Sequence, residues 1–195
     1  DLNLPFDNIS KTMPIAFSIH KGFKEITNIL INNGADLSII QRIHITDKED
    51  TIDEWPMISI AAQSGNLDLF EKVVKNSDVN LKSKLGLLPF YCLMAVSSGP
   101  KHTFQTKAAK ILINEGAKLE PNSEDENLGI SSSAITLMFG EEMPEKDRVL
   151  RERLILEIFE RGLADPFYID IEGNNMIKRA VAMGSLKIVK KLINL

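Results

Sequence analysis

The residues that could support catalysis are scattered along this sequence of 195 residues. His20, His44 and His102 show no metal-ligand spacing with one another or with the single cysteine, Cys92. A nucleophile pair of Cys92 and His102 would need a hydrogen bond between thiol and imidazole, and no motif places these side chains together. Cys92 lies in an apolar stretch, where a buried and unreactive thiol is the usual outcome. We therefore expect no catalytic residue, no cofactor site and no metal site.

Clusters of carboxylates are the second candidate for chemistry. They occur at Glu120, at 124–126 and at 141–142, in polar segments that contain Pro or Ser. Acid–base catalysis needs a carboxyl group whose pKa is raised by a dry pocket, whereas water keeps loop carboxylates ionised. The glycines occur singly at the ends of apolar runs, so the sequence has no Gly-rich cradle for a phosphate. Solvated loops are the better interpretation of these carboxylates.

Composition narrows the class of protein further. The net charge of −4 at pH 7 gives no basic surface for nucleic acid. No apolar stretch approaches the ~18–20 residues that a membrane span needs. Lys187, Lys190 and Lys191 give the last predicted helix a basic face, which we interpret as solvated. The lone cysteine fits a reducing compartment. We expect a monomeric cytoplasmic protein without nucleic-acid binding or a membrane span.

A recurring block indicates the elements that position these side chains. Its clearest copies are 13–22, 57–65 and 175–184, each ending in Gly, and each is followed by an aliphatic run at helical spacing (25–31, 68–74 and 187–193). The block predicts a helix, a Gly turn and a second helix. A second Gly (Gly34, Gly116 and Gly162) closes three of the second helices as a left-handed C-cap. Such a repeat is typical of a solenoid.

The blocks resemble ankyrin repeats, whose unit reads T-P-L-H-x-A-A-x-x-G and then I-V-x-x-L-L-x-x-G-A-D, with a period of about 33 residues. Five copies can be placed at about 7–36, 53–78, 79–118, 128–165 and 169–195, which makes 1–195 a single domain. The resemblance implies an all-α solenoid of stacked antiparallel helix pairs with turn or hairpin fingers.

The copies depart from the family pattern in two ways. Segment 37–54 is longer than the family norm and is expected to form a hairpin, while 97–103 and 140–147 are expected to be loops. No copy keeps the family histidine, whose position holds Ala16, Ser59, Tyr91, Thr136 or Lys178. Because that histidine normally ties neighbouring turns together, we expect looser stacking here. Both ends of the chain resemble the interior of a longer array, so we expect further repeats in a parent protein.

The resemblance implies a non-catalytic module that binds a protein partner through its concave face and finger loops. Carried over position by position, the partner-binding residues are Ile52, Asp53, Trp55, Gln63, Ser64, Lys84, Leu85, Leu87, Ile171, Glu172, Asn174 and Met183. Several are large apolar side chains that we expect to be exposed, as at many interfaces. Trp55 has two interpretations: an interface anchor, or a local core residue packed on the 37–54 insertion.

Two alternatives to a free-standing interaction module stay open. The array could be the targeting arm of a larger enzyme whose catalytic domain lies outside this chain. The composition resembles that of secreted bacterial effectors, which would place the protein in the host cytoplasm. The array could also be an internal scaffold that packs its apolar fingers against flanking domains.

Overall fold

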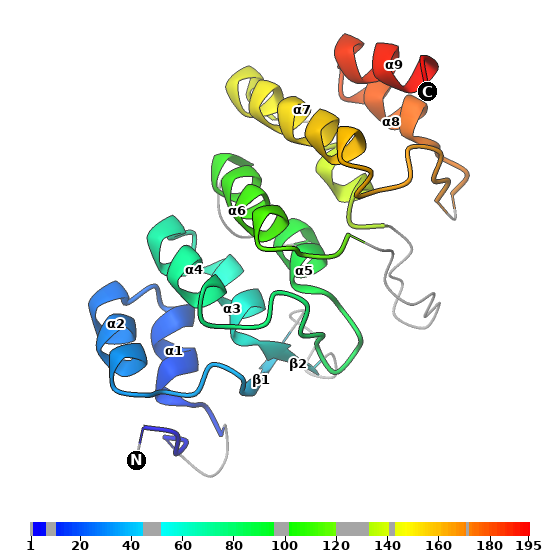
Figure 1. Ribbon diagram of the computed structural model, residues 1–195. Helices are drawn as coiled ribbons and strands as arrows, with labels where there is room; N and C mark the ends of the chain where they lie inside the picture. Colours follow the sequence, from blue (N-terminus) through cyan, green and yellow to red (C-terminus); the bar gives the residue numbers. More distant parts are fainter. Residues whose placement is uncertain are drawn as a thin grey trace. The chain divides into compact units, whose positions relative to one another are not determined.

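A computed structural model describes residues 2–6, 11–44, 52–95, 102–119, 133–140, 143–170 and 172–195, with the backbone alone at 42–44 and 52–53 (Figure 1). Helices predominate in these ranges, and a two-stranded sheet accompanies them. The predicted all-α class is confirmed at this level. The chain divides into two compact units, 1–117 and 118–195. The single domain predicted for 1–195 stays a prediction. None of the described helices is long and apolar enough to cross a membrane.

Three successive helix pairs and one hairpin form the first unit (Figure 1). In chain order these elements are α1 (Pro14–His20), α2 (Lys24–Asn32), β1 (Ile40–His44), β2 (Ile52–Pro56), α3 (Met57–Gln63), α4 (Leu67–Val74), α5 (Pro89–Ala95) and α6 (His102–Asn114). The observed bounds of α2 and α4 agree within one residue with the aliphatic runs 25–31 and 68–74. Of the loop predicted at 97–103, residues 102 and 103 belong instead to α6, which begins at His102, and the rest lies outside the described residues.

Each pair packs internally and against the next pair. The first helices form one row, in which α1 packs on α3 and α3 on α5, and α4 packs on α6. The core is aliphatic and aromatic, and the rings of Phe70 and Phe104 meet edge to face at 5.9 Å. Gly22 lies in the turn between α1 and α2 with a φ of +69°, a backbone conformation that glycine adopts at a lower free-energy cost than other residues. The repeated pattern thus buries one continuous apolar stripe.

The long insertion between the first two pairs is a hairpin, as predicted. Strands β1 and β2 pair antiparallel, with Ile40 opposite Pro56 and Gln41 opposite Trp55. Gln41 is buried, and its side-chain oxygen accepts the backbone N–H of Met13 at 3.0 Å. The hairpin is therefore fastened to the start of α1.

The second unit contains the short 3₁₀ helix η2 (Thr136–Met138) and the helices α7 (Glu145–Glu160), α8 (Met176–Ala182) and α9 (Leu186–Ile193). Helix α9 matches the predicted run 187–193, and it packs on both α7 and α8. The fourth copy differs from the expected helix pair, because its first helix is only the three-residue η2 within the described part. Pro144 precedes α7, so the loop expected at 140–147 ends where the helix begins at Glu145.

Candidate interaction site

The structure corrects the expected exposure of three predicted partner-binding residues. Trp55, Leu87 and Met183 are all buried, with 5% of Trp55 accessible to solvent. The expectation that these apolar side chains are exposed is therefore wrong. Trp55 lies in β2, at the junction of the hairpin and α3, which agrees with its interpretation as a local core residue. Leu87 directly precedes α5 in a run of buried residues, where the next helix pair begins.

The other predicted residues of the first unit lie in strand β2, at the end of α3 and in the turn before α5. Lys84 is exposed, and its Nζ lies 3.4 Å from Oε1 of Glu54 in the hairpin. Leu85, Gln63 and Ser64 are partly exposed, with Gln63 and Ser64 at the end of α3. The side chains of Ile52 and Asp53 lie outside the described residues. This part of the prediction is untested with respect to binding.

Residues 165–175 lie between α7 and α8, and in their described part, 165–170 and 172–175, local hydrogen bonds hold the backbone. Ile171 lies outside the described residues, Glu172 is exposed and Asn174 is partly exposed. At its start, Asp165 Oδ1 accepts the backbone N–H of Phe167 at 2.8 Å, which is an Asx turn. At its end, Ile169 and Asn175 form an antiparallel bridge. We refer to residues 165–175 as the 165–175 loop.

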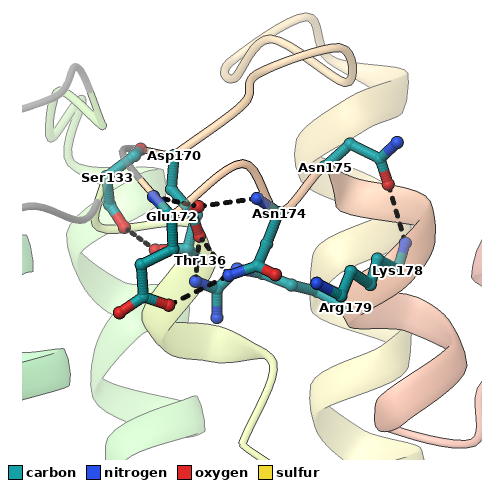
Figure 2. Close-up of polar contacts among 8 residues, drawn as sticks. All are labelled: Ser133, Thr136, Asp170, Glu172, Asn174, Asn175, Lys178 and Arg179. Carbon is teal, nitrogen blue, oxygen red and sulfur yellow. Dashed lines mark hydrogen bonds and ion pairs between the residues drawn. The ribbon is translucent and has the colours of Figure 1, made fainter.

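The carboxylate of Asp170 organises this loop (Figure 2). Its Oδ1 accepts the backbone N–H groups of Glu172 at 3.0 Å and of Asn174 at 2.8 Å. Its Oδ2 accepts the side-chain amide of Asn174 at 3.3 Å and forms an ion pair with Arg179 of α8. Only 1% of the Asp170 side chain is exposed. The loop is thus held to the helix that follows it by a buried, multiply bonded carboxylate.

The ionised form of Asp170 is favoured by these contacts. Burial by itself raises the pKa of the carboxyl group, but hydrogen bonds from Arg179 and Asn174 and the charge of Arg179 outweigh it and lower the pKa. Asn174 Nδ2 also donates to Oε2 of Glu172 at 3.0 Å. Asn175 begins α8 by accepting the backbone N–H of Lys178 at 2.8 Å, as Figure 2 shows. The 165–175 loop is therefore pre-organised on a helix N-terminus.

Two large apolar side chains point out of this ordered loop, and the sequence reasoning missed both. Phe167 is 64% exposed and Ile169 is 61% exposed. The signal in the sequence was the run Asp165-Pro166-Phe167-Tyr168-Ile169, which places apolar residues in a turn. The backbone of Phe167 is fixed by Asp165, and that of Ile169 by the bridge to Asn175. Little further ordering would be needed for these side chains to bind a partner.

Comparison with known proteins adds no assignment: the sequence matches neither a protein-family model nor a curated protein. Within the described ranges, no group of three or more His, Cys, Asp or Glu side chains is placed to hold a metal ion. The 165–175 loop is therefore the main candidate for an interaction site, because it presents exposed apolar side chains next to polar groups that hydrogen bonds hold in place.

The positions that the sequence comparison aligned with the family histidine have different local contacts. Ser59 is fully buried, and its hydroxyl has no hydrogen-bond partner among the described residues. Thr136 instead donates its hydroxyl to the carbonyl of Ser133 at 2.6 Å, within its own turn (Figure 2). Lys178 is exposed. An unpaired buried hydroxyl costs on the order of 1–3 kcal/mol.

Proposed function

We propose that this chain is an ankyrin-type, non-catalytic interaction module that binds a protein partner through the loops between its helix pairs. The 165–175 loop is the principal contact in this proposal. Its single strongest support is that Phe167 and Ile169 are more than half exposed on a loop whose backbone is fixed by Asp165 and Asp170. Large apolar side chains on a rigid loop bind with a small loss of conformational entropy.

The helix pairs act as the scaffold in this proposal. The pairs α1–α2, α3–α4 and α8–α9 have the helix, Gly turn and helix order of the ankyrin unit, and the pairs of the first unit pack side by side. Repeat arrays of this kind present loops from successive units on one surface. Trp55, Leu87 and Met183 belong to the scaffold, whereas Lys84, Leu85, Glu172 and Asn174 remain candidate contacts. The single cysteine, Cys92, is buried and free of any disulfide, which supports the cytoplasmic location in this proposal.

The test compares the partners retained by three immobilised forms of the protein. Wild-type protein, Phe167→Ala/Ile169→Ala and Ile29→Ala are exposed to the same cytosol, and bound proteins are quantified by mass spectrometry. Ile29 is a matched control, because it is 62% exposed and lies on α2, away from any loop. We expect one protein to be retained by wild type and Ile29→Ala, and its recovery to fall at least tenfold with the double variant. Equal retention by all three forms would contradict the proposal.

A further inference from the structure

Asn33 and Gly34, at the C-terminal end of α2, form the single Asn-Gly pair of this sequence. The backbone nitrogen that follows an asparagine can attack the side-chain amide carbon, and glycine hinders this attack least, because it has no side chain and its backbone is the most mobile. Asn33 is exposed, so water reaches its amide. Asn76, at the same distance from the Gly turn of the next helix pair, is exposed as well. Exposure therefore belongs to this position in the helix pair, and the pair Asn33-Gly34 is a candidate site of covalent modification.

The end of α2 holds both reacting groups in hydrogen bonds. Nδ2 of Asn33 donates to the carbonyl of Ile29 at 2.8 Å, and the backbone N–H of Gly34 donates to the carbonyl of Ile31 at 3.1 Å. The ψ of Asn33 is 16° in this arrangement. The attack needs rotation about the Asn33 Cα–C bond, which brings the nitrogen of Gly34 to Cγ and breaks both hydrogen bonds. The reaction therefore proceeds from molecules in which the end of α2 has opened locally.

We propose that Asn33 is a modification site, which converts to aspartate or isoaspartate at a rate set by the opening of α2. Gly34 N loses its proton to water and forms a bond to Cγ of Asn33, while Nδ2 leaves as ammonia. Water then opens the five-membered imide. Cleavage of the new N–Cγ bond gives aspartate, and cleavage of the original peptide bond gives isoaspartate, in which the chain continues through Cγ. One water is consumed and one ammonia is released, without an oxidant or reductant.

Both products weaken the end of α2. A carboxylate at position 33 has no proton to donate to Ile29, and it lies at a helix C-terminus, where the helix dipole disfavours negative charge. Isoaspartate also adds one methylene group to the backbone just before Ala35 and Leu37, whose side chains are buried. Because ammonia is lost, refolding does not reverse the change. The modification thus converts local opening into a permanent loss of stability in the first helix pair.

The test follows the full chain at pH 8 and 37 °C, both folded and in urea. Trypsin releases residues 25–42 and 76–82, and mass spectrometry with fragmentation locates the modified residue and identifies isoaspartate. We expect Asn33 to be modified first, and at least tenfold more slowly in the folded chain than in urea. Asn76 is the matched control, because its Nδ2 makes the same bond, to the carbonyl of Lys72 at 2.8 Å, but Ser77 follows it. It should stay intact over the same period.

Variants of the anchoring contacts test the role of local opening. Leu37→Ala removes a buried side chain just after the turn, and Asn3→Ala removes the acceptor of the Asp36 N–H at 2.9 Å. We expect each variant to speed the modification of Asn33 several-fold in the folded chain and to leave the rate in urea unchanged. Leu192→Ala, which alters a similarly buried leucine of α9, should not change the rate at Asn33.

The effect on stability is tested with a mimic of the product. Asn33→Asp is expected to lower the melting temperature. Asn32→Asp should not lower it, because its carboxylate keeps an acceptor for Nζ of Lys72, which lies 3.2 Å from Oδ1 of Asn32.

Four results would overturn the proposal: an intact Asn33 in urea, earlier modification of another asparagine, equal rates in the folded and unfolded chain, or an unchanged melting temperature in Asn33→Asp. None of these measurements involves Phe167 or Ile169, so the proposed partner site on the 165–175 loop is judged separately.

Discussion

Arg179 of α8 forms an ion pair with the buried carboxylate of Asp170, nine residues earlier, and so joins the 165–175 loop to the helix that follows it. The contact has an asymmetric environment, because the Asp170 side chain is 1% exposed and that of Arg179 is 23% exposed. Removal of Arg179 would therefore leave a buried charge unpaired, whereas removal of the Asp170 carboxylate would leave a partly exposed charge unpaired.

We predict that Arg179→Met destabilises the chain by about 2–4 kcal/mol, because it leaves the buried charge of Asp170 without its counter-ion. The free energy of unfolding in urea measures this loss. Faster hydrogen exchange at the amides of Glu172 and Asn174 should accompany it, since both donate to Asp170. Lys75→Met is the control: its pair with Glu71 is exposed and screened by solvent, so a much smaller loss of stability is expected. Equal effects of the two substitutions would contradict this account of Asp170.

The stability of the chain should fall at acid pH because of two buried carboxylates. Burial by itself raises the pKa of both Glu152 and Asp170. In Glu152, hydrogen bonds from Ser185 and Lys187 outweigh burial and lower the pKa. In Asp170, hydrogen bonds from Arg179 and Asn174 do the same. A carboxyl group whose pKa is lower in the folded than in the unfolded state stabilises the protein at pH values above its unfolded pKa, which is about 4. That stability is lost as the pH falls through the lower, folded pKa.

Melting temperature measured between pH 7 and pH 2 tests this dependence. We expect a steep decrease below about pH 4 in the wild type and a shallower one in Asp170→Asn, which has no carboxyl to titrate at that position. Asp68→Asn serves as the control, since its pair with Lys24 is exposed and screened by solvent. A wild-type and an Asp170→Asn profile of the same slope would show that Asp170 contributes nothing to acid unfolding.

Ser185 should contribute more than an ordinary N-cap. Its hydroxyl oxygen accepts the backbone N–H of Ile188 at the start of α9 and donates to Oε2 of Glu152 in α7 at 2.5 Å. Ser185→Ala is expected to cost about 2–3 kcal/mol, from the lost cap and from the lost hydrogen bond to Oε2 of Glu152, whose other oxygen keeps its pair with Lys187. Asn66→Ala removes the cap of α4, which accepts from Leu69 at 3.1 Å, and should cost about 1 kcal/mol. The difference between the two unfolding free energies measures the bond to Glu152, and a difference near zero would contradict it.

Trp55→Ala should destabilise the first unit by about 3–5 kcal/mol, because removal of a buried indole leaves a cavity beside α3. This is the opposite of what an exposed interface anchor would do. Phe167→Ala removes a side chain that is mostly in solvent, so its effect on stability should stay within about 0.5 kcal/mol. Thermal unfolding of both variants tests the contrast. An unchanged melting temperature in Trp55→Ala would return Trp55 to the list of partner contacts.

The helices themselves were readable from the sequence because their signals are local. Aliphatic residues at helical spacing and single glycines predicted α2, α4 and α9 to within a residue at each end. The extra length of 37–54 predicted the hairpin, whose strands are now seen at Ile40–His44 and Ile52–Pro56. The first helix of the fourth copy was predicted on weaker periodicity, and the described part of that region holds only η2.

The candidate site was harder to predict because burial depends on which elements pack together. Sequence position placed Trp55, Leu87 and Met183 near turns, yet each lies where a neighbouring element covers it. Conversely, no local pattern distinguishes Ile177 from Ile15, although one is exposed and the other is fully buried. Burial at such a position depends on the elements that pack around it, which is a property of the tertiary structure.

Periodicity and turn chemistry, which involve residues close together in the sequence, thus predicted successive helices and the insertion that forms the hairpin. The contacts that give the chain its specific surface join more distant residues: Ser185 to Glu152, Gln41 to Met13 and Lys84 to Glu54. Such hydrogen bonds and burial depend on which residues lie close together in three dimensions. Composition and the spacing of residues along the sequence do not show this. The exposure of Phe167 and Ile169 and the burial of the Asp170 carboxylate likewise depend on which elements pack around the loop.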